Sequence, residues 1–131
     1  MTKHEKLAEE YFLSGYNCAQ AVFLAFAEEQ GFSREAAARI ASSFGGGVGG
    51  MREMCGALSG LCMAAGLLYG YDSPKAYEEK AEHYARIREL ADGFRAQFGT
   101  ILCRDILGLG EHPKPAMPQR RSAEYYKDRP C

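Results

Sequence analysis

The segment from Met54 to Tyr71 contains 18 residues without a charged side chain, and it limits the folds that are open to this chain. A stretch of this length can either cross a membrane or form a helix that is buried among other helices. Several glycines interrupt it, and the neighbouring segments are amphipathic. Because amphipathic helices need an apolar partner, we interpret the segment as a central buried helix and predict no stable membrane span.

Helical spacing and capping signals recur along the rest of the chain. A favoured N-cap residue precedes four apolar patterns: Asn17, Ser33, Ser73 and Thr100. The glycine-rich run 45–50 leads into the apolar segment, whose helix should begin near Arg52 or Glu53. No alternation typical of a strand persists for five residues. The sequence therefore predicts an all-α domain over residues 1–107, a helical bundle of about five or six helices.

The longest expected helix begins at Ser73 and Pro74, where a serine cap precedes a proline at the first helical position. Its expected buried stripe consists of Tyr77, Ala81, Tyr84, Ile87, Ala91, Phe94 and Phe98. After Gly108, prolines at positions 113, 115 and 118 exclude a regular helix. Residues 108–131 are predicted to form an irregular, proline-rich tail that carries Cys131, with one helical turn near 123–126.

The overall charge argues against a nucleic-acid-binding protein. The 131 residues carry a formal net charge of −1 and give a pI of about 6.3, whereas such proteins usually have a basic excess. The N-terminal segment contains no apolar signal core, so we expect a cytoplasmic protein. The pair Arg120 and Arg121 is too small a basic cluster to predict a site. The run 45–50 matches G-x-G-x-x-G, but no strand precedes it, so nucleotide binding is not predicted.

Four of the five cysteines are the candidate functional residues: Cys18, Cys55, Cys103 and Cys131. In a cytoplasmic chain, such thiols are more often reactive or metal-bound than structural. The first three fall at expected helix N-termini, where free N–H groups and the helix dipole stabilise a thiolate and should lower the thiol pKa. Cys62 lies two turns after Cys55, beyond disulfide reach, and is interpreted as a packing residue.

Gly56 and Gly60 lie four residues apart in the same expected helix. Each costs about 1 kcal/mol of helix stability relative to alanine, so the presence of both predicts that another backbone approaches this face closely. Such an approach can bring the cysteine of another segment near Cys55. The glycine run 45–50 is expected to act as a hinge or to pack tightly over the helix of Cys55.

Together, these motifs resemble a small family that is named for its C…GCAxxG…C…C cysteine pattern. The matching segments are Gly15 to Ala21, the glycine run, Cys55 to Gly60 and Phe98 to Arg104. The resemblance spans about residues 11–107 and implies a redox-active protein of bacteria or archaea, associated with transporter or oxidoreductase systems. It implies redox roles for Cys18, Cys55, Cys103 and Cys131. Relatives fused to haem domains also suggest an iron–sulfur role.

Three functions stay open at this point. A redox protein with thiol-disulfide oxidoreductase-like activity would use Cys55 as nucleophile and Cys18 or Cys103 as resolving cysteine, with a partner protein or a small oxidant. It needs no bound cofactor. An iron–sulfur or other metal-binding module would use Cys18, Cys55, Cys103 and Cys131 as thiolate ligands. A structural or adaptor helical protein would use its cysteines as core residues. A homodimer is compatible with each function.

Overall fold

The computed structural model describes all 131 residues, and helices form nearly all of its regular structure. The helices are α1 (Lys3–Leu13), α2 (Cys18–Ala27), α3 (Arg34–Ala41), α4 (Gly56–Tyr69), α5 (Tyr77–Phe98), α6 (Cys103–Ile106) and α7 (Ala123–Tyr126), with short 3₁₀ turns at Glu28–Gln30 and Ser42–Phe44. The one β-bridge joins Met54 to Leu102. The predicted all-α class is confirmed, and no helix combines the length and the apolar character needed to cross a membrane.

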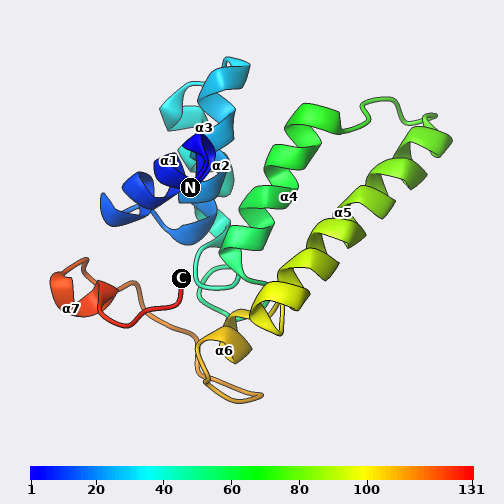
Figure 1. Ribbon diagram of the computed structural model, residues 1–131. Coiled ribbons are helices and arrows are strands. Elements are labelled where there is room, and N and C mark those ends of the chain that lie inside the picture. Colours follow the sequence, from blue (N-terminus) through cyan, green and yellow to red (C-terminus); the bar gives the residue numbers. More distant parts are fainter.

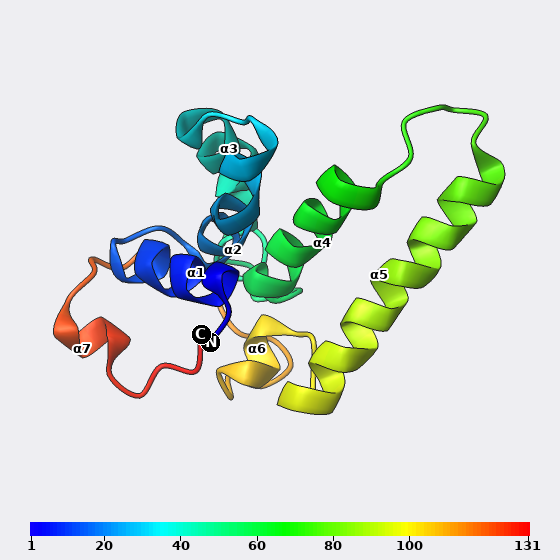
Figure 2. The same cartoon turned by 45° about the horizontal axis from the view of Figure 1, so that its top comes forward.

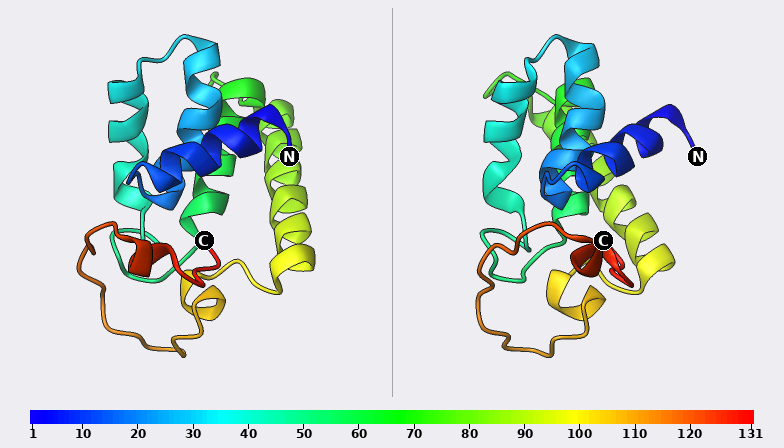
Figure 3. Two further views of the ribbon diagram at one scale, coloured as in Figure 1. Left: turned by 60° about the vertical axis from the view of Figure 1, so that its left-hand side comes forward. Right: turned by 90° about the vertical axis from the view of Figure 1, so that its left-hand side faces the viewer.

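Helix α2 is the centre of the packing, because α1, α3 and α4 all contact it (Figures 1 and 3). The core consists of Ala19, Phe23, Leu24, Ala27, Ala37, Ala41 and Ala64. Alanine supplies most of this core, so the helix backbones can approach closely. The Met54 to Tyr71 segment contributes α4, which packs on α2; the prediction that this segment is the central helix is wrong, because α2 holds that place and α4 has only α2 and α5 beside it to any extent.

The starts of α2 and α3 follow their predicted caps. The side chain of Asn17 accepts a hydrogen bond from the Gln20 N–H at 2.8 Å, and the Gln20 side chain accepts one from the Asn17 N–H at 3.0 Å. The Ser33 hydroxyl accepts from the Ala36 N–H at 3.1 Å. Each bond satisfies a donor that the first helical turn leaves free, and local sequence is sufficient to specify it.

The predicted starts of α4 and α6 are wrong, because the segments before these helices pair with each other. Residues 52–55 are not helical; Arg52 adopts a φ of +64°, and the Cys55 N–H donates to the Ile101 carbonyl at 2.8 Å. Helix α6 begins at Cys103, since the Thr100 hydroxyl accepts from the Leu102 N–H within the preceding turn. Helix α4 therefore begins three to four residues later than the sequence predicts, and α6 begins two residues later.

The predicted start and buried stripe of α5 are also wrong in part. The Ser73 hydroxyl accepts from the Lys75 N–H and closes a turn, so the helix begins at Tyr77. Helix α5 packs mainly on α4, and the two separate toward the loop that connects them (Figure 2). With so little coverage, α5 buries only His83 and leaves Tyr77, Tyr84 and Phe98 exposed.

Residues 108–131 return across the base of the molecule to α1 and α2 (Figure 3). The hydroxyl of Tyr126 donates to the Phe12 carbonyl at 2.9 Å, and the Ala116 N–H donates to the Gly50 carbonyl at 3.0 Å. The predicted helical turn is present as α7, capped by Ser122. These contacts bring the final residue, Cys131, under the starts of α2 and α4.

Candidate functional site

The four candidate cysteines, Cys18, Cys55, Cys103 and Cys131, line one small apolar cavity of about 70 Å³. They are the first residue of α2, the residue before α4, the first residue of α6 and the last residue of the chain. The apolar wall comes from Phe94, Phe98, Ile106 and Leu107. Cys62 lies elsewhere, in a depression between α4 and α5. All five cysteines have free thiols in this structure.

Cys18 lies against the start of α4 because Gly56 has no side chain. A Cβ atom at Gly56 would overlap the Cys18 sulfur and lie 2.9 Å from the Phe44 carbonyl oxygen, and one at Gly60 would lie 2.7 Å from the Ala19 carbonyl oxygen. The predicted close approach of another backbone is therefore confirmed. It brings the Cys18 thiol next to the residue that follows Cys55.

Cys55 and Cys103 are held by a short antiparallel pairing on either side of the Met54–Leu102 bridge. The Cys55 N–H donates to the Ile101 carbonyl at 2.8 Å, and the Cys103 N–H donates to the Glu53 carbonyl at 2.6 Å. The two cysteines thus occupy diagonal positions on the same face of the pairing. This bridge accounts for a juxtaposition that neither helix could produce alone.

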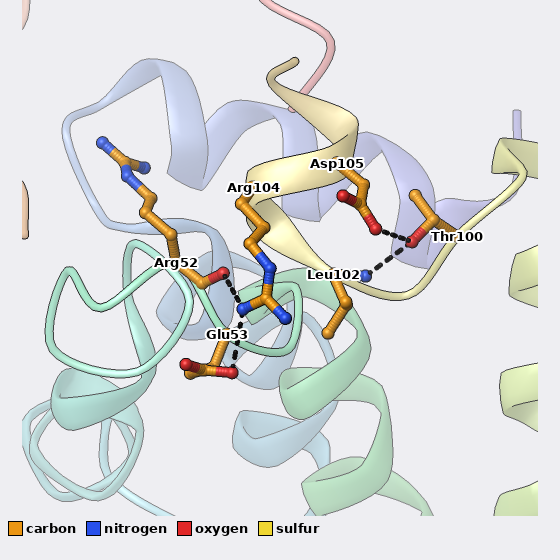
Figure 4. A network of polar contacts seen from close by, with 6 residues as sticks. All are labelled: Arg52, Glu53, Thr100, Leu102, Arg104 and Asp105. Atoms are coloured by element: carbon orange, nitrogen blue, oxygen red, sulfur yellow. Dashed lines mark hydrogen bonds and ion pairs between the residues drawn. The ribbon is translucent and has the colours of Figure 1, made fainter. Parts of the chain in front are cut away.

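Polar contacts fix both halves of this pairing (Figure 4). Arg104 donates to the Glu53 carboxylate at 3.1 Å and to the Arg52 carbonyl at 3.5 Å. The Thr100 hydroxyl donates to the Asp105 carboxylate at 3.0 Å. The side chain of Arg52 points away from Arg104, and its Nη1 donates to the Cys103 sulfur at 3.5 Å. A guanidinium is therefore in place to stabilise negative charge on Cys103.

The glycine run 45–50 packs against this pairing. Gly47 has a φ of +72°, and a Cβ atom there would lie 2.6 Å from the Glu53 nitrogen and 2.7 Å from the Cys103 Cβ. No residue with a side chain fits so close to Cys103. Of the two expectations for this run, tight packing beside the cysteines agrees with the structure.

The predicted lowering of the Cys55 pKa is wrong. Burial raises the pKa of the Cys55 thiol to about 11, and the neighbouring thiols of Cys18 and Cys131 add to the increase. The backbone N–H groups of Leu58 and Ala57, at the start of α4, do lower this pKa, as a helix N-terminus should. Desolvation is the larger effect.

Burial also raises the pKa of Cys131, with a further increase from Cys18 and a decrease from the guanidinium of Arg129. Burial alone raises the pKa of Cys62. At neutral pH, Cys55, Cys62 and Cys131 therefore carry protonated thiols.

Four thiols around one cavity are a suitable donor set for a thiophilic metal. In their present arrangement, however, no three histidine, cysteine or carboxylate side chains form a metal-binding group. A bound metal or cluster would require the sulfurs to move toward a common centre.

Sequence reasoning missed a second cavity, which Arg52, Arg121 and Arg129 line together with the glycine run. Arg52 lies far from the other two in the sequence, and Arg121 belongs to the pair Arg120 and Arg121, which is too small a basic cluster to predict a site. Arg52 lies three residues before Cys55, and Arg129 lies two residues before Cys131. That proximity to two candidate cysteines was the one sign in the sequence that these arginines could belong to the site.

Comparison with protein families matches residues 16–131 to a model described as "Putative redox-active protein (C_GCAxxG_C_C)". The match includes all four cavity cysteines and the whole tail. Comparisons with curated proteins and with solved structures give no match. Because the family model covers most of the chain, this protein belongs to the C_GCAxxG_C_C family.

Proposed function

We propose that this protein is a small redox protein that cycles between free thiols and a disulfide. The observation that carries the proposal is the convergence of the four cysteines, from four separate segments, on one cavity of about 70 Å³. Thiol–disulfide exchange needs sulfurs that can reach one another and an attacking thiolate. Membership of the family gives independent support.

Cys103 is the better candidate for the attacking thiol. Arg52 donates a hydrogen bond to its sulfur, whereas the pKa of about 11 keeps Cys55 protonated at neutral pH. The Cys103 thiolate attacks a disulfide of a partner protein or of a small oxidant, forming a mixed disulfide and releasing one thiol. This assignment replaces Cys55 as the nucleophile.

A second cavity thiol then attacks the Cys103 sulfur and releases the other half of the acceptor as a thiol. In total, two protein thiols lose two electrons and two protons, one internal S–S bond forms, and the acceptor S–S bond is reduced. Cys18, Cys55 and Cys131 all line the cavity and are available for this resolving step. Cys62 does not line it.

The test is a count of titratable thiols before and after oxidation by a small disulfide, with the bonded pair identified by mass spectrometry of the digested protein. We expect the loss of two thiols per chain, reversed by dithiothreitol, and an internal bond between cavity cysteines. Cys62→Ser is the matched control and should behave like the natural chain. Cys103→Ser should slow the first step by at least about tenfold. Five thiols that stay free, as expected of a purely structural protein, would refute the proposal.

A metal-binding module is the second candidate, because four thiols line one cavity and a thiophilic cation would stabilise them as thiolates, whereas burial and the neighbouring thiols now raise the pKa values of Cys55 and Cys131. The absorption spectrum and metal content of anaerobically purified protein separate the two functions. A coloured or metal-loaded protein that loses its metal in Cys103→Ser and keeps it in Cys62→Ser would favour this second function.

A further inference from the structure

A second cavity, of about 310 Å³, lies beside the cysteines, and its lining is strongly basic. We call it the arginine cavity. Arg52, Arg121 and Arg129 line it, together with Asn17, Tyr125 and the glycine run, and no aspartate or glutamate does so. The run contributes backbone without side chains; a Cβ at Gly45 would clash with the Asn17 side chain. The cavity is large enough for a small ligand.

The arginines of this cavity have buried donors without partners. The chain has four buried side-chain nitrogen or oxygen atoms that lack a hydrogen bond, and three of them are Arg52 Nε, Arg121 Nη1 and Arg129 Nε. An unpaired buried donor normally costs about 1–3 kcal/mol, and most native donors avoid this cost. Three such atoms around one cavity indicate that a ligand with several acceptor atoms completes it.

The arrangement of the charges supports the same conclusion. The guanidinium of Arg121 lies 4.0 Å from the centre of the Tyr125 ring, and that of Arg129 lies 3.9 Å from it. Neither these two arginines nor Arg52 forms an ion pair, whereas neighbouring Arg104 pairs with Glu53. Like charges gathered around one ring repel each other, and an anion between them relieves this repulsion.

The arginine cavity adjoins the cysteine cavity at three points. Arg52 donates to the Cys103 sulfur, Asn17 precedes Cys18, and Arg129 is separated from Cys131 by one residue, Pro130, which itself lines the cysteine cavity. A ligand anchored by the arginines would therefore have its remaining atoms close to the sulfurs.

We propose that the arginine cavity binds the carboxylate or phosphate group of a small anionic disulfide and presents its sulfur to the cysteines. This inference rests on the proposed redox function, because it names the class of oxidant that the thiols reduce. The disulfide accepts two electrons and two protons from two protein thiols and leaves as two small thiols.

The first experiment tests the cavity without redox chemistry. Inorganic phosphate is titrated by calorimetry, at constant ionic strength, into the protein reduced with dithiothreitol. Oxidised glutathione, which supplies carboxylates, is titrated into a variant in which serine replaces the four cavity cysteines, so that no thiol can react. We expect Arg121→Gln to weaken binding by about tenfold or more, the effect of losing a charged hydrogen bond. Arg120→Gln, one residue away and outside the cavity, should bind like the natural chain. The proposal would be overturned if neither anion binds its protein while both proteins melt like the natural chain. It would also be overturned if Arg121→Gln and Arg120→Gln weaken binding equally.

The second experiment compares two disulfides of opposite charge, oxidised glutathione and cystamine, as oxidants of the reduced protein. We expect faster oxidation by the anionic disulfide, by about tenfold at low salt, and loss of that preference in Arg121→Gln. Equal rates with the natural chain would overturn the proposal. Phosphate binding that depends on Arg121, together with no oxidation by either compound, would reject the redox function and leave the anion site supported.

Discussion

The two ends of α4 are packed in opposite ways. We call the first residues of α4 its cysteine end. Four parts of the chain converge there on Gly56 and its neighbours: α2, the glycine run, α6 and the tail. At the other end of α4, which we call the open end, α4 and α5 separate (Figure 2). Tyr69 and Tyr84 remain exposed there. Close packing is thus concentrated where the thiols must be held in place. The open end keeps apolar surface that no part of this chain covers.

Two glycines of α4 test this contrast most strongly. Gly56→Ala places a Cβ against the Cys18 sulfur and near the Phe44 carbonyl, so we expect it to lower the free energy of unfolding by about 1–3 kcal/mol. Gly66→Ala near the open end meets no atom within 4 Å and should raise that free energy by up to about 1 kcal/mol through helix propensity. The measurement is urea unfolding, with the midpoints compared at a common slope.

The thiol chemistry supplies the control for this pair. Gly56→Ala should also slow internal disulfide formation, because it separates Cys18 from the start of α4, whereas Gly66→Ala should leave the rate unchanged. Equal stability changes in the two variants would show that the cysteine end is no more tightly packed than the open end.

The titration of Cys55 gives the next largest effect. Its pKa is raised from 9.0 to about 11, so the folded state holds the proton more tightly than the unfolded state does. The contribution of this group to stability is complete below pH 9 and is lost as the pH rises through 11. At 1.36 kcal/mol per pKa unit, and with the thiol partly accessible to water, the loss is roughly 2 kcal/mol.

Unfolding measured between pH 8 and pH 11 checks this expectation. Cys55→Ser should remove the steepest part of the decline, and the difference between the variant and the natural chain isolates this thiol from the other ionisable groups of the chain. Cys62→Ser, farther along α4, should flatten the curve less. A curve that Cys55→Ser leaves unchanged would mean that the thiol is hydrated in the folded protein.

Local and long-range determinants explain how much of this molecule its sequence predicts. Asn17 and Ser33 cap their helices because their partners lie three residues away. The starts of α4 and α6 depend on hydrogen bonds between residues 52–55 and 101–104, which no local pattern encodes. The motif singled out Cys18, Cys55, Cys103 and Cys131 as candidates, but which of them meet in space, and the burial that raises the pKa of Cys55, depend on the assembled cavity.

The arginine cavity shows the same limit more clearly. Arg52 and Arg121 lie far apart in the chain, and only the return of the tail brings them to one cavity. An isolated pair of arginines in a proline-rich segment is not distinctive. The absence of any acidic partner becomes informative only after the fold is known.

The open end provides a test of association. Helix α5 has three glutamates and one lysine before residue 86, and three arginines with two carboxylates from residue 86 onward. Two copies of α5 packed antiparallel would therefore oppose unlike charges across a two-fold axis and would cover Tyr77 and Tyr84. We expect the protein to form a homodimer through this surface.

Sedimentation velocity over a range of concentrations measures this association. Tyr84→Glu should weaken it by about tenfold or more, since a charge would be buried at the contact. Ile40→Glu on α3 is the matched control, because both side chains are 49% exposed. A protein that stays monomeric at every concentration would show that the exposed aromatic residues serve another purpose.

The tail gives the smallest predicted effect and tests how firmly the cysteine end is closed. Tyr126→Phe removes only the hydroxyl that donates to the Phe12 carbonyl, so we expect a loss of about 1 kcal/mol in unfolding free energy. Cys131 is an exposed residue whose side chain lines the cysteine cavity, and a tail that is held less firmly leaves this cavity more often, so its thiol should also react faster with an alkylating reagent. Tyr69→Phe at the open end is the control; its exposed hydroxyl makes no hydrogen bond within the chain, and its loss should change neither quantity.

Faster alkylation of Cys131 with unchanged reactivity of Cys103 would show that the tail moves independently of the 52–55 and 101–104 pairing. Equal acceleration at both residues would instead mean that the tail and the pairing open together as one unit.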